Sequence, residues 1–449
     1  MTTIDPEITT AKPETTQARP KSPLWALARR VHFMAGLMIA PFLAVLALTG
    51  LIYAFTPQLN DLLYSDKLYV ESAGGPVRPL DDQVSAALAS HPGGKVKSVI
   101  VPSDPERTTQ VVLDAPGLAH GADHFSTETL TVYVDPYTGK VNGDLVTVNN
   151  RPPAQVWLRE LHGSLHLGDT GRLYSEFVAS WLPFVVLGGL VLWIGRRRKR
   201  TARALLLPAN TGSPRARTRS RHGALGLWLA VGLLGVSVTG LTWSNYAGGR
   251  FDSAIAALDA KSPSLTAPAV QASGAAISLD RALSVARAEG LSDQVTITVP
   301  TADTKPLKIA ETAEGLPIRK TTIAVDPYTA EVTARQGWDD FPLLAKLTTL
   351  GVQIHSGTLF GFANQLAMAL LAVGALALLV LGYRMWWRRR PTTGGLAAAP
   401  EPAWRQVSVP VLVVAIVVVG AIGWALPVFG VTLVAFVLVD GLRTAKSRV

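Results

Sequence analysis

Long apolar runs with positive charge at one end constrain this chain of 449 residues more than any other feature. The first run follows Arg29 and Arg30 and is long enough, as a helix, to cross the roughly 30 Å of hydrocarbon in a bilayer. A second run ends at Arg196, a third starts after Arg221, and a fourth ends at Arg384. Because the bilayer interior offers no water to backbone groups, such runs predict membrane helices.

The positive charge lies beside these runs and sets the predicted topology. Residues 196–221 hold ten Lys or Arg and no Asp or Glu, so the positive-inside rule places this loop in the cytoplasm. Both termini are then cytoplasmic, and the polar stretches lie outside. The net charge of +10 comes from these clusters, which lack the pattern of a nucleic-acid surface, so we expect no nucleic-acid partner. The chain has no Cys, which excludes disulfides, iron–sulfur clusters and covalently attached haem.

Two polar stretches of domain size separate the runs. Each predicts a helix, in LDDQVSAALASH and ISLDRALSVARAEG, and several strands rich in β-branched residues. We therefore predict a membrane α-helical bundle, with a four-helix core and two further C-terminal helices, that carries two extracytoplasmic α+β domains. The predicted boundaries are 1–24 for a disordered cytoplasmic tail, 25–57, 158–195, 222–244, 346–387, 406–426 and 427–441 for six spans, 58–157 and 245–345 for the α+β domains, 196–221 for the basic cytoplasmic loop, 388–405 for a linker and 442–449 for a second cytoplasmic tail.

The two halves of the chain match one another. Similar motifs recur at offsets of 190 to 193 residues, which predicts an internal repeat. Each half is a span, an extracytoplasmic domain and a second span, so both copies have the same orientation and the repeat is parallel. The matched positions are His32 and His222, Thr49-Gly50 and Thr239-Gly240, Asp135-Pro136-Tyr137-Thr138 and Asp326-Pro327-Tyr328-Thr329, and Leu161-His162 and Ile354-His355.

Five of the eight histidines stand beside the apolar runs, where ionisable residues are rare unless they serve a function. The repeat predicts that His32 approaches His222 near the cytoplasmic face, and that His162 approaches His355 near the outer face. Facing imidazoles in a helix bundle can ligate haem iron, so we predict two non-covalent b-type haems. His166 lies one helical turn beyond His162 and has no counterpart in the second half. It is either the actual outer ligand or a contact to a haem propionate or a substrate.

Other interpretations of the ionisable residues stay open. An interfacial His is commonly a hydrogen-bonded anchor. A metal ion other than haem iron would have few carboxylates nearby, and Glu160 and Asp169 are the candidates for supporting groups. His120 and His124, with Asp123, could hold a surface metal, although their Gly-rich surroundings favour a mobile hairpin tip.

Two further sets of residues have two interpretations each. Thr49-Gly50 and Thr239-Gly240 fit either close helix packing or close approach of a porphyrin. Trp193, Trp228 and Trp243 fit either an aromatic belt at the membrane surface or packing on a porphyrin.

Taken together, these motifs resemble the PepSY-associated transmembrane family. They are RRVHFMAGL with LALTGLIY, VYVDPYTGKV, LHGSLHLGDTGRL, RHGALGLW with VTGLTW, AVDPYTAEV, IHSGTLFG and GYRMWWRRR, and they cover about residues 25–390. The resemblance implies that the α+β stretches are PepSY domains and that the chain lies in the bacterial cytoplasmic (inner) membrane. Ala330 replaces the glycine of the DPxTG turn in the second half, so we expect that turn to differ.

The resemblance also implies a role in iron uptake, since members of the family include haem-containing ferric-siderophore reductases. The five histidines match the family pattern, and the implied activity is reduction of ferric iron or a ferric siderophore at the outer face. No GxGxxG motif follows a strand and opens a helix, so the electron donor is expected to be separate, a quinol or a cytoplasmic reductase. The alternative is a non-enzymatic PepSY module, anchored in membrane lipid, that binds or inhibits an extracytoplasmic protease or senses a ligand. A transporter is a third possibility.

Overall fold

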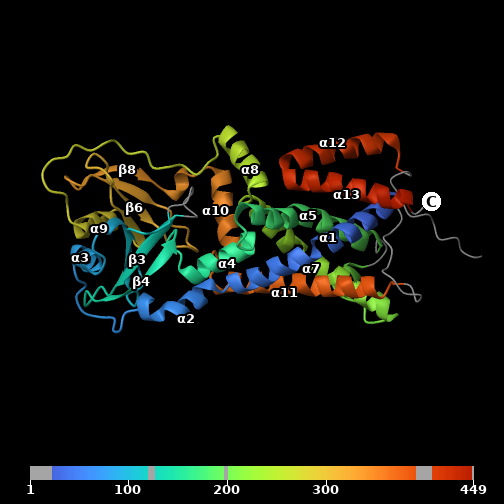
Figure 1. Ribbon diagram of the computed structural model, residues 1–449, viewed down its shortest axis with the longest axis horizontal. Helices are drawn as coiled ribbons and strands as arrows, with labels where there is room; N and C mark the ends of the chain where they lie inside the picture. The colour runs from blue at the N-terminus through green and yellow to red at the C-terminus, as the bar shows by residue number, and fades with distance from the viewer. Residues whose placement is uncertain (1–22, 120–126, 197–200, 391–406, 447–449) are drawn as a thin grey trace, which may run out of the picture.

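Long helices form an elongated bundle with a β-sheet at one end (Figure 1). The computed structural model describes residues 23–119, 127–196, 201–390 and 407–446. Within these ranges, four helices are long and apolar enough to cross a membrane, as expected from their sequence. They are α1 (Pro23–Tyr53), α5 (Gly168–Arg196), α7 (Pro214–Leu241) and α11 (Phe362–Trp387), and α1 and α7 each contact both α5 and α11.

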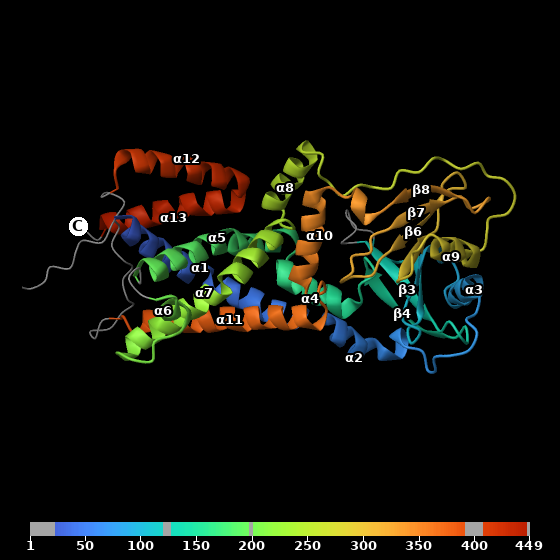
Figure 2. The same ribbon diagram turned by 180° about the vertical axis from the view of Figure 1, so that it is seen from behind.

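Two shorter apolar helices form a hairpin beside the bundle, where the sequence predicts two further spans (Figures 1 and 2). They are α12 (Val409–Ala425) and α13 (Pro427–Lys446). Helix α13 packs on α5, where the indole Nε1 of Trp181 donates to Oγ1 of Thr432 over 2.8 Å. Near its other end, Asp440 accepts hydrogen bonds from Arg30 of α1, and both side chains are largely buried. These contacts fix α13 along the bundle.

Two further helices lie between the bundle and the sheet (Figure 2). They are α4 (Pro153–Ser164) and α10 (Leu343–Ser356). The expected spans 158–195 and 346–387 are therefore each divided into a short helix and a long one. The first break comes at Leu165, whose backbone is left-handed (φ 55°), and the second at Gly357 (φ 84°). A left-handed residue ends a helix because it turns the chain away from the helical path.

The two polar stretches contribute to one antiparallel sheet of eight strands, in the order β4-β3-β2-β1-β5-β6-β7-β8. The first stretch supplies β1 (Lys95–Val101), β2 (Thr109–Asp114), β3 (Glu128–Val134) and β4 (Val141–Val148). The second supplies β5 (Val295–Thr298), β6 (Leu307–Glu311), β7 (Thr322–Val325) and β8 (Val332–Gln336). Strands β1 and β5 join them, with Ser98 opposite Thr298 and Val101 opposite Val295. The expectation of two domains did not include this pairing.

The helices α3 (Leu80–Ser90) and α9 (Leu279–Ala288) cap one another across the same junction. The carboxylate of Asp280 accepts from the backbone N–H of Leu80 over 2.9 Å, and that of Asp81 accepts from the N–H of Leu279 over 3.2 Å. Each helix thus supplies an anion to the exposed N–H groups at the other's start. Leu80 also packs into the core formed by β5, β6, β7 and α9, so the two stretches share a hydrophobic core.

The turns that follow β3 and β7 are alike, which corrects the expectation that Ala330 makes them differ. Asp135 Oδ1 accepts from the N–H of Tyr137 over 2.8 Å, and Asp326 Oδ1 accepts from that of Tyr328 over the same distance. Gly139 has φ 75° and Ala330 has φ 64°. Ala330 therefore adopts the left-handed conformation at a steric cost that Gly139 does not have.

The remaining helices connect these elements. They are α2 (Thr56–Leu68), α6 (Ala202–Leu206), α8 (Tyr246–Ala257) and the short 3-10 helix η1 (Trp338–Asp340). The predicted basic loop is partly helical, because α7 begins at Pro214, with the side chain of Ser213 accepting from the N–H of Ala216. The expected tail 1–24 lies outside the described residues except for Pro23 and Leu24, which begin α1. The expected linker 388–405 lies outside them after Arg390.

Candidate functional site

His32 and His222 lie together inside the bundle, as predicted. His32 belongs to α1 and His222 to α7, and their ring centroids are 6.2 Å apart with the rings at 77°. We call them the distal pair, because they lie toward the bundle end farther from the sheet. Neither side chain is fully buried.

His162 and His355 form the proximal pair, on the two helices between the bundle and the sheet. His162 is in α4 and His355 is in α10. Burial lowers the pKa of the His162 imidazole to about 4. Burial, and secondly the electrostatic effect of His162, lower the pKa of His355 to about 4. Both rings are therefore neutral at neutral pH, the form in which imidazole donates a nitrogen lone pair to a metal.

A threonine hydroxyl holds each imidazole of the proximal pair. Oγ1 of Thr49 lies 2.8 Å from Nδ1 of His162, and Oγ1 of Thr239 lies 2.7 Å from Nδ1 of His355. Each hydroxyl also donates its one proton to the carbonyl four residues earlier, that of Val45 or Gly235, over 2.8 Å.

These hydrogen bonds determine which nitrogen of each proximal ring carries the proton. Since a hydroxyl has one proton, both contacts of each threonine are satisfied together when its oxygen accepts from Nδ1–H of the histidine. The lone pair of each neutral ring is then at Nε2. Within the described residues, no side chain or backbone group makes a hydrogen bond to Nε2 of His162 or His355.

The distal pair is held in a related way. Nδ1 of His32 lies 2.7 Å from the carbonyl oxygen of Val185, and because a carbonyl only accepts, this Nδ1 carries the proton. The carbonyl of Leu378 lies near His222, 193 residues after Val185. Nδ1 of His222 is nevertheless buried without a hydrogen bond of normal geometry to any described residue. Three of the four rings thus have their lone pair at Nε2.

Each of the four rings also lies against a glycine of a neighbouring helix. A Cβ at Gly189 would come 2.9 Å from Cε1 of His32, and a Cβ at Gly50 would come 3.2 Å from Cε1 of His162. The same atom of His355 would be 3.6 Å from a Cβ at Gly240, and that of His222 would be 3.8 Å from one at Gly382. The glycines leave space that the imidazole rings occupy. Thr49-Gly50 and Thr239-Gly240 therefore position histidines, a role that the sequence motifs did not reveal.

His166 differs from the proximal pair in its backbone conformation and in its exposure. Helix α4 ends at Ser164, and His166 has a left-handed backbone (φ 57°), so the expected helical turn between His162 and His166 is wrong. Its Nδ1 lies 3.4 Å from a carboxylate oxygen of Glu160, and its ring lies 5.0 Å from the Trp157 ring. About 31% of the side chain is exposed.

The other candidates have varied surroundings. The Trp243 ring lies 5.6 Å from that of His355, whereas Trp193 and Trp228 donate their indole N–H to carbonyls of α6, at Leu205 and Leu206. Asp169 stands in the first turn of α5. His120, Asp123 and His124 lie outside the described residues. Across the described parts of the chain, no three His, Asp or Glu side chains gather into a group that could hold a metal ion.

Comparison with known proteins places this arrangement in a family. No curated protein matches the chain. A family model described as the PepSY-associated TM region matches residues 29–389, which include both histidine pairs, both Thr-Gly motifs and all eight strands. The chain therefore belongs to the PepSY-associated transmembrane family.

Proposed function

We propose that this membrane protein is a b-type di-haem electron-transfer protein that reduces ferric iron or a ferric siderophore. The observation that carries the proposal is the hydrogen bonding of the imidazoles. Histidines that bind metals almost always donate their second ring N–H to a carbonyl, carboxylate or other acceptor, which leaves Nε2 for the metal. His32, His162 and His355 each have this arrangement.

The number of ligands at each pair also favours haem. Two imidazoles alone do not complete the coordination of zinc, which takes four ligands in structural sites. Two axial imidazoles suit an iron whose remaining positions are filled by a porphyrin. We assign His32 and His222 to one haem, and His162 and His355 to the other. A bound haem would supply one-electron redox chemistry.

At the proximal pair, we propose His162 as the axial ligand in place of His166. Thr49 orients the His162 ring, and Gly50 makes room for it. His166 is instead exposed beside Glu160 and Trp157, at the bundle end that carries the sheet. We assign it to contact with a propionate or with the substrate.

The sheet side of the proximal pair offers groups that suit a polar iron chelate. A pocket of about 230 Å³ lies between α2, α4 and the sheet, and its polar lining includes Asn60, Gln155 and Arg107, whose guanidinium is paired with Asp61 over 2.9 Å. Oδ1 of Asn60 is buried there without a hydrogen-bond partner among the described residues. Gln155 belongs to α4, the helix of His162. We propose that the substrate approaches from this side, where the Asn60 oxygen can accept a hydrogen bond from a donor group of the chelate.

The proposed setting is the bacterial cytoplasmic membrane, with both termini in the cytoplasm and the sheet outside. The charge of residues 196–221 supports this orientation. The matching hydrogen bonds at Thr49 and Thr239 support a parallel internal repeat in the bundle. Electrons would come from a quinol or a cytoplasmic reductase and pass from the distal to the proximal pair.

A visible spectrum tests the proposal. The full-length protein, expressed with ample haem and purified in detergent, is expected to show a Soret band and sharp α and β bands on reduction, with equal haem at the two pairs. Addition of a ferric siderophore to the reduced protein is expected to reoxidise it. A colourless protein would overturn the proposal and favour a non-enzymatic PepSY module. If the protein binds haem but ferric chelates do not reoxidise it, the haem assignment stands and the proposed reductase activity is wrong.

A further inference from the structure

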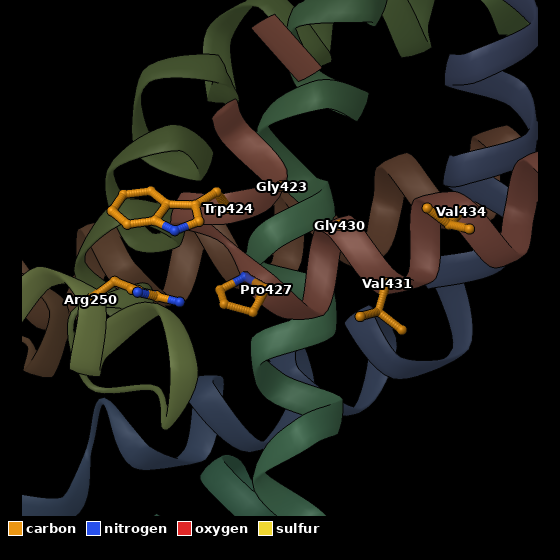
Figure 3. Close-up of a pocket in the computed structure, with 7 residues that line it drawn as sticks. All are labelled: Arg250, Gly423, Trp424, Pro427, Gly430, Val431 and Val434. Carbon is orange, nitrogen blue, oxygen red and sulfur yellow. The ribbon is translucent and has the colours of Figure 1, made fainter. Parts of the chain in front are cut away.

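A cavity of about 480 Å³ opens between α8 and the α12–α13 hairpin, away from both histidine pairs (Figure 3). Its wall is almost wholly apolar and includes Trp424, Pro427, Val431 and Val434, with Arg250 as its one charged residue. The figure shows Trp424 and Arg250 close together, and Val431 and Val434 farther along α13. The cavity is therefore a groove with a cation at one end and hydrocarbon along its length.

Two glycines shape the groove. A Cβ at Gly430 would come 2.8 Å from the carbonyl oxygen of Gly423, and one at Gly423 would come 3.1 Å from Cα of Gly430. Because neither has a side chain, α12 and α13 touch backbone to backbone beside their connecting turn. Pro427, Val431 and Val434 then follow one face of α13, at helical spacing.

Arg250 is an uncompensated charge in this apolar setting. Its guanidinium lies over the Trp424 ring, 4.7 Å from the centroid. The side chain is exposed and makes no hydrogen bond or ion pair with any described residue. An arginine at the level of a membrane surface attracts anionic headgroups, and an adjacent Trp marks that level.

The residues that line the groove favour a phospholipid over a quinol, another apolar ligand of the bilayer. Oxidation of a quinol releases protons, which a site commonly passes to a carboxylate or an imidazole. The described lining of the groove has neither group. A phospholipid needs no proton acceptor, but only a cation for its phosphate and an apolar wall for a chain.

We infer that this groove binds an anionic phospholipid. Arg250 binds the headgroup phosphate, and Pro427, Val431 and Val434 bind one acyl chain. The lipid belongs to the leaflet on the sheet side of the bundle, since α8 follows the sheet-side end of α7. It bridges α8 to the C-terminal hairpin, which gives that hairpin a function independent of the histidines.

The test compares lipid retention by full-length variants. Protein is reconstituted in nanodiscs of equal phosphatidylglycerol and phosphatidylcholine, extracted in mild detergent, and its retained lipids are measured by mass spectrometry. Wild type is expected to retain phosphatidylglycerol preferentially, even with excess inorganic phosphate. Arg250→Gln is expected to lower the ratio of the two lipids about fivefold, the effect of one surface cation. Val434→Trp fills the groove and is expected to lower retention while Arg250 stays in place.

Arg335→Gln is the charge-matched control, since Arg335 lies in the sheet and pairs with Glu289. It is expected to leave lipid retention unchanged. The inference is overturned if Arg250→Gln retains the wild-type ratio, or if both arginine variants lower the ratio equally. Displacement of the lipid by phosphate alone would overturn the role of the apolar wall. A spectrum or melting curve equal to that of wild type shows that each variant is folded.

Discussion

Oγ1 of Thr239 lies 2.7 Å from Nδ1 of His355, while its own proton is donated to the carbonyl of Gly235. Both hydrogen bonds form together when the hydroxyl accepts from the imidazole, so this arrangement favours the tautomer whose lone pair is at Nε2. Thr49 has the same relation to His162. Helix geometry controls the protonation of each ring, because the hydroxyl is held by the backbone of its own helix.

Removal of this acceptor is expected to weaken haem binding at the proximal pair. Thr239→Val preserves the shape of the side chain and removes the oxygen, so the affinity for one haem falls by about 10-fold or more, as for other groups that support metal-bound histidines. Haem titration of the apoprotein measures this change. Thr239→Ser is expected to restore the affinity. Thr348→Val is the matched control, since that hydroxyl binds only the carbonyl of Leu344; equal losses in the two valine variants would contradict the assignment.

The proximal ligand can be identified by comparing two alanine variants. His162→Ala is expected to lower the haem content by about half, because one axial ligand of one haem is lost. His166→Ala is expected to keep the full haem content and to change only the rate of reoxidation by a ferric chelate. The haem-to-protein ratio from reduced spectra measures both. The reverse pattern would make His166 the ligand.

The distal pair is expected to be sensitive to the size of residue 189. A methyl group in Gly189→Ala would come 2.9 Å from Cε1 of His32, so the ring must move. We expect loss of the distal haem with the proximal haem retained, measured from the spectrum and the haem content. Gly420→Ala is the control, since no atom outside its own helix backbone and chain neighbours lies within 4 Å of a Cβ at that position of α12. Unchanged haem in Gly189→Ala would show that the close contact is not needed.

The sequence predicts the bundle better than the connections around it. Hydropathy is a local property, so the apolar runs correctly predict α1, α5, α7 and α11. The breaks at Leu165 and Gly357 depend on one left-handed residue each, and periodicity does not detect such residues. The junction of β1 and β5 joins segments almost 200 residues apart, and local patterns do not encode that register.

In the candidate site too, the sequence predicts the features that are local and misses those that depend on how the helices pack. The repeated histidines correctly predict that His32 and His222 lie together. The partners of the rings were missed, although Thr49-Gly50 and Thr239-Gly240 recur at the same offset as those histidines. Their role depends on which helix neighbours which, and that is a property of the packed bundle.

The turn after β7 is expected to gain stability from Ala330→Gly. Ala330 has φ 64°, a conformation that costs an L-residue about 1 kcal/mol or more and costs glycine little. The substitution is expected to raise the melting temperature of the sheet, and Gly139→Ala is expected to lower it in the equivalent turn. Thermal unfolding followed by circular dichroism measures both. A lower melting temperature for Ala330→Gly, or an unchanged or higher one for Gly139→Ala, would contradict the similarity of the turns.

The pairing of β1 with β5 in one sheet predicts where an engineered disulfide can form. Ser98 of β1 stands opposite Thr298 of β5, and the chain has no Cys of its own. The double variant Ser98→Cys, Thr298→Cys is therefore expected to form an intramolecular disulfide under mild oxidation, since opposed strand residues lie within the range that a disulfide spans. Gel mobility before and after reduction measures the bond. Ser98→Cys with Thr322→Cys is the control, because β7 is not a neighbour of β1. Equal cross-linking in the two pairs, or none in the first, would mean that the two polar stretches form separate sheets.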